Sequence, residues 1–286
     1  MKEIIRSIPF CKIDGHIHTH LCDGKPEMTV ESIARKAEEV GLSLIILTPH
    51  FHKKVSDASA TLYDDSNVEI LKNLRQEINC YDGKVKILLS AEADILNING
   101  DVSLDRDDAL DFITYTVNYH PLLPLKAVEV TYSACIEDIY KSGLYADFEK
   151  AAGGTERVIE ALYKAEINAI KKATHPVSLG HFFAAHSYAV GNYSWFNMQP
   201  HHINLMKEGA SELIDVCRQA DAMIDLTGIH PKDMTHDQKI AADGFFYEFQ
   251  RWFISLCRQK DIVIYPGSDA HSLRSVGNVS YYNNLI

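Results

Sequence analysis

The sequence lacks a long apolar segment and any paired-cysteine motif. No uninterrupted run of about 18 apolar residues occurs, so no transmembrane helix is predicted. The first residues, MKEIIRSIPFCKIDGH, contain no apolar stretch of the kind that a signal peptide requires. The six cysteines are scattered without a CxxC pair, which is typical of reduced thiols. Together these absences predict a cytoplasmic protein that does not associate with a membrane.

Positive charge is also in short supply. Lysine and arginine total 28 against 39 aspartates and glutamates, which gives a formal net charge of −11. An acidic surface repels phosphate backbones at long range, so a nucleic-acid partner is not expected. A metal ion or a local cationic site can still hold one phosphate, so a small phosphorylated substrate is compatible with this charge. No pattern indicates the oligomeric state.

The composition that remains is that of one folded domain. Hydrophobic residues make up 46% and charged residues 23% of the 286 residues, which excludes a disordered chain. Apart from the irregular stretch 182–204, no repeat, low-complexity tract or linker divides the chain. Residues 1–286 are therefore expected to form a single domain.

Apolar strand-like runs alternate with segments of helical periodicity along the chain. From Val30 to Val40 the apolar residues recur at i, i+3, i+4 and i+7, with Thr29 as N-cap and Gly41 as the stop. The same criteria predict strands at 42–47, 84–94, 112–117, 177–179, 222–226 and 262–271, and further helices at 68–78, 154–172, 208–220 and 244–260. This alternation predicts an α/β fold with a parallel sheet, and six or seven such units favour closure into a barrel.

Histidine is the over-represented residue type, with 14 copies, about twice the usual share. Several histidines and acidic residues lie at or just past the C-terminal ends of predicted strands: His16, His18, His50, Glu92, His120, His181, Asp269 and His271. In a parallel barrel these ends meet on one face, so we expect the side chains to share one pocket. Histidine is also the commonest metal ligand, which makes this pocket a candidate metal site.

Motifs at the two ends of the sequence carry most of this prediction. His16 and His18, in DGHIHTHLCDG, point to the same side of a strand, so both imidazoles can reach one ion. Asp269 and His271, in GSDAH, have the same i, i+2 spacing, and Gly267 permits a close approach of the backbone.

Glu92 lies on an otherwise apolar strand, in LLSAEAD. A carboxylate buried there without a partner is costly, so a metal or another cation is implied. Asp94 lies on the same side of the strand and is expected to support the site. His50 ends the strand 42–47, and His52 is a further polar group beside it.

The other histidines divide into candidates and surface residues. His120 is favoured as a ligand by its position at a strand end. His181 follows the strand 177–179 and is favoured over His175, which follows a helix and resembles a linker residue. The remaining histidines are expected on the surface: His20, His186, His201, His202, His230 and His236.

The number of candidate ligands indicates more than one ion. Eight or nine candidates exceed the roughly four ligands that one zinc ion takes. Nitrogen and carboxylate donors without cysteine suit Zn, Mn or Fe.

The order of these residues resembles the motifs of the polymerase and histidinol phosphatase (PHP) superfamily. That pattern has HxH near the N-terminus, a histidine after an apolar strand, a strand-end glutamate, two mid-chain histidines and a late DxH. Chain length, spacing and the final GSDxH look like the histidinol-phosphate phosphatase branch, although residues 123–170 and 182–220 match nothing in particular. The resemblance implies a distorted (β/α)7 barrel with two or three divalent ions at the C-terminal ends of its strands.

The resemblance also implies how the ligands divide among the ions. One ion takes His16, His18, Glu92 and Asp269; a second shares Glu92 and adds His120 and His181; a third takes Asp23, His50 and His271. Two positions depart from the pattern. Asp23 stands where several relatives have a histidine. Pro49, in Thr48-Pro49-His50, stands where the aspartate of a Thr-Asp-His motif is usual.

The activity that these motifs imply is metal-dependent hydrolysis of a phosphomonoester by metal-bound hydroxide. L-histidinol phosphate, giving L-histidinol and phosphate, is the expected substrate. His52 is a candidate acid or substrate contact, and Arg274 is a candidate phosphate contact. Three alternatives are kept: the same chemistry on phosphotyrosine or nucleotides, a metal-dependent amidohydrolase (which uses a carboxylated lysine), and a metal-binding module without turnover.

Overall fold

The structure, a computed structural model, describes residues 1–22, 24–53, 66–118, 150, 152–180, 182, 200–227 and 245–280. Its helices are α1 (Lys2–Arg6), α2 (Val30–Glu39), α3 (Val68–Cys80), α6 (Thr155–Lys172), α8 (Pro200–Gln219) and α10 (Phe245–Gln259), with 3-10 turns η1 (Phe10–Lys12) and η2 (Leu273–Ser275). Its strands are β1 (Ile13–Ile17), β2 (Leu44–Leu47), β3 (His50–Phe51), β4 (Lys86–Leu89), β5 (Glu92–Asp94), β6 (Ile113–Thr116), β7 (Val177–Leu179), β8 (Met223–Asp225) and β9 (Ile264–Tyr265). The predicted α/β alternation is confirmed.

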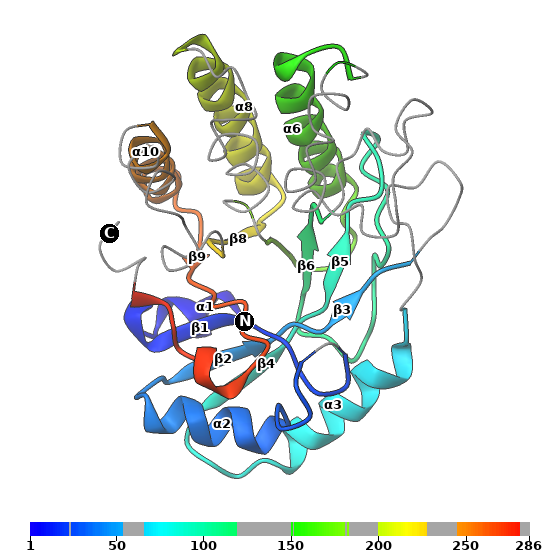
Figure 1. Ribbon diagram of the computed structural model, residues 1–286, viewed down its shortest axis with the longest axis vertical. Coiled ribbons are helices and arrows are strands. Elements are labelled where there is room, and N and C mark those ends of the chain that lie inside the picture. Colours follow the sequence, from blue (N-terminus) through cyan, green and yellow to red (C-terminus); the bar gives the residue numbers. More distant parts are fainter. Residues whose placement is uncertain are drawn as a thin grey trace.

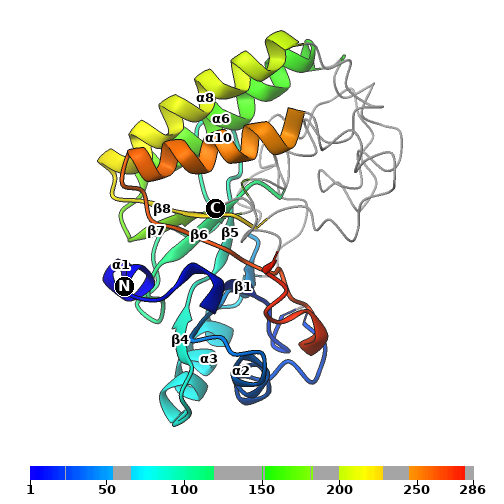
Figure 2. The ribbon, with the colours of Figure 1, turned by 90° about the vertical axis from the view of Figure 1, so that its left-hand side faces the viewer.

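The strands form two parallel sheets (Figure 1). One sheet has the order β1-β2-β4 and the other the order β3-β5-β6-β7-β8-β9. Helices α2 and α3 lie against the first sheet, whereas α6, α8 and α10 lie side by side over the second (Figures 1 and 2). Apolar residues of the sheets and helices form one main buried core between these layers.

Two chain segments pass from the first sheet into the second through short interruptions. β2 ends at Leu47 and β3 begins at His50, and the intervening Pro49 has no N–H for the ladder. The predicted strand 84–94 is likewise split, into β4 and β5. Pairing continues across the breaks, because Glu92 N donates to Pro49 O at 2.9 Å and Ser90 N donates to Leu47 O at 2.8 Å. The strand ends that carry His50 and Glu92 therefore stay in register.

The first strand and the segment after the last strand lie next to each other. Gly15 N donates to Pro266 O at 2.7 Å, and Ile17 forms a parallel bridge with Ala270. A side chain at Gly15 would collide with the ring of Tyr265, so only glycine fits this approach. Residues near the two ends of the sequence are thereby held side by side, where β1 contacts the segment after β9.

Helix α2 shows how local sequence sets these elements. The side chain of Thr29 accepts a hydrogen bond from Ser32 N, and Gly41, with φ of 79°, follows the end of the helix. The predicted helix 208–220 instead begins at Pro200, because proline suits the first turn of a helix.

The described residues include no helix that is both long and apolar enough to cross a membrane.

Asp14 fastens the first strand to the chain that follows β9. Its carboxylate is fully buried and accepts hydrogen bonds from Ser268 N at 2.9 Å and Gly277 N at 2.7 Å. Burial raises the pKa of Asp14 to about 6, although the backbone donors act in the opposite direction. The carboxylate thus accepts hydrogen bonds from two backbone N–H groups at once.

We expect Asp14→Asn to lower the free energy of unfolding by about 2 kcal/mol and Tm by about 4–8 °C. Asparagine offers one acceptor oxygen and turns an NH2 group toward one of the two backbone N–H donors. Thermal unfolding of the wild type and the variant measures the effect. Asp108→Asn is the matched control, because the Asp108 side chain is 86% exposed. An equal Tm for Asp14→Asn and Asp108→Asn would contradict the expectation.

Candidate metal centre

Two pairs of candidate ligands from opposite ends of the sequence meet at the edge where β1 lies beside the chain after β9. His16 lies in β1 and His18 follows it, so both side chains project from the same side. His18 N donates to Ala270 O at 3.0 Å, which sets the HxH pair alongside Asp269 and His271. A Cβ added at Gly267 would lie 2.6 Å from His16 Cβ, so glycine is required there.

Glu92 lies at the centre of the converging histidines. His50 and Glu92 are register partners in the parallel pair β3–β5. The Glu92 Oε2 atom lies 3.2 Å from His16 Nε2, 3.5 Å from His18 Nε2 and 3.3 Å from His50 Nε2. Its other oxygen, Oε1, accepts a hydrogen bond from Asn118 Nδ2 at 2.6 Å. One fully buried carboxylate therefore faces three imidazole nitrogens.

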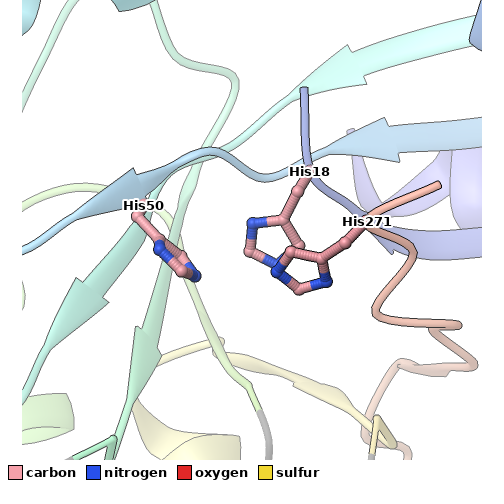
Figure 3. A group of neighbouring side chains, drawn as sticks. All are labelled: His18, His50 and His271. Carbon is pink, nitrogen blue, oxygen red and sulfur yellow. The ribbon is translucent and has the colours of Figure 1, made fainter. Parts of the chain in front are cut away.

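Further side chains surround His18, and Figure 3 shows two of them, His50 and His271. His18 Nε2 lies 2.9 Å from Asp269 Oδ1, and the His271 ring stacks on the His18 ring with centroids 3.9 Å apart. One nitrogen from each of His18, His50 and His271 lies within 4.8 Å of the other two, and His16, His18 and Asp269 form a similar group. His18 thus belongs to both groups.

The backbone at Asp269 has a left-handed conformation. Its φ is 53°, a value that aspartate and asparagine adopt more readily than other residues with side chains. Such conformations persist where the surroundings impose them, often at functional sites. The Asp269 carboxylate is held toward His18 by this turn rather than by a regular strand.

The charges of the centre call for a cation. Burial alone lowers the pKa of His16, but its contacts with the Asp225 and Glu92 carboxylates outweigh burial and raise that pKa to about 10. A proton on His16 thus compensates two buried acids. Imidazole and carboxylate donors suit zinc, manganese or iron, so this donor set fits divalent ions that would replace the proton.

Asp225 is a member of the site that the sequence analysis missed. It ends β8, is fully buried, and its Oδ2 lies 2.7 Å from His16 Nδ1. Its Oδ1 accepts a hydrogen bond from Thr227 N at 2.8 Å. Asp225 therefore fixes the ring of His16 and leaves Nε2 directed at Glu92. The available signal was its strand-end position in AMIDL, the same signal that identified Glu92.

Asp225→Asn is expected to weaken metal binding by about 10–100-fold, because the partner of a ligating histidine fixes its tautomer and basicity. Competition with a chromogenic chelator measures the affinity. Asp215→Asn on α8 is the control, since that side chain is half exposed and pairs with Lys260. Unchanged affinity in a folded Asp225→Asn protein would contradict this assignment of Asp225.

Two other predicted positions lie near the centre with different surroundings. His52 is buried, its ring centroid is 4.5 Å from that of His50, and its Nδ1 lies 2.6 Å from Asp94 Oδ2. Asp94 therefore contacts His52, and Asn118 Nδ2 also donates to Asp94 Oδ1 at 3.2 Å. Arg274 is exposed and lies in η2.

The remaining predictions have mixed outcomes. His20 is half-buried, with Nδ1 3.2 Å from Met28 O, and His175 is half-buried between α6 and β7. His201 is exposed as predicted, but the surface prediction for His202 is wrong, because it is buried in the first turn of α8. The other predicted positions lie outside the described residues: Asp23, His120, His181, His186, His230 and His236.

This chain is similar to known proteins in sequence and in fold. No family model matches it. It is 24% identical over 286 residues to the histidinol-phosphatase of Bacillus subtilis (strain 168), which covers 93% of this chain and 96% of that protein. The structure of a candidate histidinol phosphatase from Listeria monocytogenes matches with a TM-score of 0.60, 16% identity, and coverage of 95% of this chain and 99% of that one.

A second solved structure has the same fold. It is the histidinol phosphate phosphatase of Lactococcus lactis subsp. lactis, complexed with zinc, L-histidinol and phosphate. The TM-score is 0.56 at 15% identity, covering 96% of this chain and 92% of that one. The chain is thus histidinol-phosphatase-like in sequence along nearly its whole length, and it shares the fold of both structures.

Proposed function

We propose that this chain is a metal-dependent phosphatase of the PHP type that hydrolyses L-histidinol phosphate to L-histidinol and phosphate. One observation carries the proposal: the strand-end side chains that the motifs predict converge around one buried carboxylate. His16, His18 and His50 face the Glu92 carboxylate, and Asp269 and His271 lie against His18. The near full-length similarity to a histidinol-phosphatase and the shared fold support the substrate class.

The same side chains hold the divalent ions in this proposal. One ion is bound by His16, His18, Glu92 and Asp269. In support, ligand atoms of His16, His18 and Asp269 lie within 4.8 Å of one another, and Glu92 Oε2 lies 3.2 Å from His16 Nε2 and 3.5 Å from His18 Nε2. A second ion is bound by His50 and His271 together with Asp23. A third ion is bound by His120 and His181 and shares Glu92 with the first. Zinc, manganese and iron all suit these donors.

Divalent ions bound there supply Lewis-acid charge to the phosphoryl oxygens and activate water as a nucleophile at neutral pH. The chain itself orients the side chains that bind the ions. Asp225 holds the His16 ring, and Asn118 holds the Glu92 carboxylate by a 2.6 Å hydrogen bond. Positions fixed in this way need no rearrangement when negative charge develops on the phosphoryl group.

His52 is proposed as the group that moves a proton. Asp94 lies 2.6 Å from His52 Nδ1, so the neutral ring keeps its proton on Nδ1 and exchanges a second proton at Nε2. As the P–O bond to the leaving group breaks, that second proton passes to the departing alkoxide oxygen. Arg274, in η2 three residues after His271, is proposed to contact the phosphate.

We also propose that the two sheets are parts of one distorted (β/α)7 barrel in a single domain of residues 1–286. β2 with β3, and β4 with β5, each count as one interrupted strand. The hydrogen bond from Gly15 to Pro266 and the Ile17–Ala270 bridge support an approach of the first strand to the last. The metal site then lies at the C-terminal ends of the barrel strands.

The test of this function is phosphate release from L-histidinol phosphate by protein reconstituted with manganese or zinc. The double variant Asp269→Asn/His271→Ala is the control, and asparagine suits the left-handed backbone at position 269. Rapid release by the wild type and loss in the variant support both substrate and ligand pair. If metals bind but histidinol phosphate survives, the substrate assignment fails, and phosphotyrosine, nucleotides and amides are assayed next. Tight binding without turnover of any of them would indicate a metal-binding module.

A further inference from the structure

A second group of histidines and a carboxylate lies on the helix layer. Glu156 is in the first turn of α6, and His201 and His202 are in the first turn of α8. These helices lie side by side with their N-terminal ends at the same end of the layer (Figures 1 and 2). None of the three residues belongs to the centre around Glu92.

The three side chains converge on a small volume. Glu156 Oε1 lies 3.1 Å from His201 Nε2 and 3.3 Å from His202 Nε2. The two rings have centroids 4.1 Å apart and are inclined by 53°. One ligand atom from each residue lies within 4.8 Å of the other two. Two adjacent helical residues and a residue from another helix therefore direct their ligand atoms to one point.

The two glutamate–histidine separations are close to those of neighbouring ligands around a tetrahedral ion. Metal–ligand bonds of 2.0–2.1 Å in a tetrahedron place neighbouring ligand atoms about 3.3–3.4 Å apart. The observed separations of 3.1 and 3.3 Å need only small adjustments to reach that spacing. Two imidazoles and one carboxylate form a ligand set that zinc accepts, with water in the fourth position.

The surroundings keep the Glu156 carboxylate charged and hold the His202 side chain in a buried position. The pKa of Glu156 is lowered to about 2 by its own backbone N–H and by contacts with His201 and His202. The first turn of a helix further favours negative charge. His202 is only 5% exposed, whereas Glu156 and His201 are more than half exposed, so an ion can enter from solvent.

We propose that Glu156, His201 and His202 bind a divalent transition-metal ion, zinc by ligand class, that clamps the N-terminal ends of α6 and α8 together. The ion takes no part in phosphoester chemistry. Its role is to fix α8, the helix that precedes β8, against α6.

Zinc content per chain tests the proposal without any assay of activity. Wild type, Glu156→Gln and His201→Ala are dialysed against the same zinc solution and analysed for metal and protein. The expected result is one zinc ion fewer per chain in both variants. Glu160→Gln, which removes an exposed charge one turn further along α6, is the matched control and keeps the wild-type count.

Thermal unfolding separates a metal clamp from an ion pair between histidine and glutamate. For a clamp, zinc raises the Tm of the wild type and of Glu160→Gln by more than that of Glu156→Gln. An equal zinc count in the wild type and Glu156→Gln overturns the proposal. It is also overturned if Glu156→Gln lowers Tm by the same amount with and without zinc, since that is the behaviour of an ion pair only. Circular dichroism checks that each variant is folded.

Discussion

Glu92→Gln is expected to reduce phosphate release by at least about 10³-fold while the protein stays folded. Glutamine has nearly the shape of glutamate but no charge, and it would place a neutral amide against three imidazole nitrogens that lie within 3.5 Å of Oε2. Because Glu92 is shared by the proposed ion sites, its loss removes charge from more than one of them. Steady-state kinetics with histidinol phosphate and metal analysis measure both effects.

The control for this substitution is Glu69→Gln, in which an exposed carboxylate of α3 is neutralised. It is expected to leave turnover and metal content unchanged. A folded Glu92→Gln protein that kept its metals and stayed within tenfold of wild-type turnover would contradict the central position given to Glu92.

Removal of the metals is the second change with a large expected effect. A strong chelator should abolish phosphate release and lower Tm, because an ion that binds only the folded chain stabilises it by about 4 kcal/mol at a thousandfold excess over Kd. For a chain of this size that corresponds to a Tm lower by about 8–16 °C. Without the ions, a proton on His16, which contacts both buried carboxylates, offsets the charge of Glu92 and Asp225.

Readdition of zinc or manganese should restore both activity and Tm. The Glu92→Gln variant is the internal control for differential scanning fluorimetry, since its Tm should respond much less to the chelator. A wild-type Tm and turnover that were insensitive to a chelator, with metal shown to be removed, would refute the metal-dependent function.

Most of the centre was predictable because the rule that locates it is simple. The C-terminal ends of the parallel strands of a barrel lie on one face. Candidate ligands with i, i+2 spacing can therefore be found once the strands are recognised in the sequence. His16 and His18 precede Asp269 and His271 by most of the chain, yet the backbone bridge between Ile17 and Ala270 joins them.

What could not be predicted has specific physical causes. Asp225 has a strand-end position like that of Glu92 but no histidine or acidic residue at i+2, and Asn118 has only its strand-end position, so the pair of histidine or acidic residues that marks His16/His18 and Asp269/His271 is missing at both. The split of 84–94 into β4 and β5 depends on contacts with β2 and β3 that a one-dimensional pattern does not contain. The sequence pattern predicts a helix only from residue 208, so it does not indicate that His202 lies in the first turn of α8 with its side chain buried.

The pairing of His18 with Asp269 also has a consequence for biosynthesis. These residues are separated by 251 positions, so a ribosome adding roughly 5–20 residues per second needs roughly 13–50 s between them. During that interval the growing chain has the HxH pair but not its late acidic partner. Ions captured by such a nascent chain have an incomplete set of ligands and dissociate easily. Stable metal binding at this centre is therefore expected only after the segment that carries Asp269 has left the ribosome and packed beside β1.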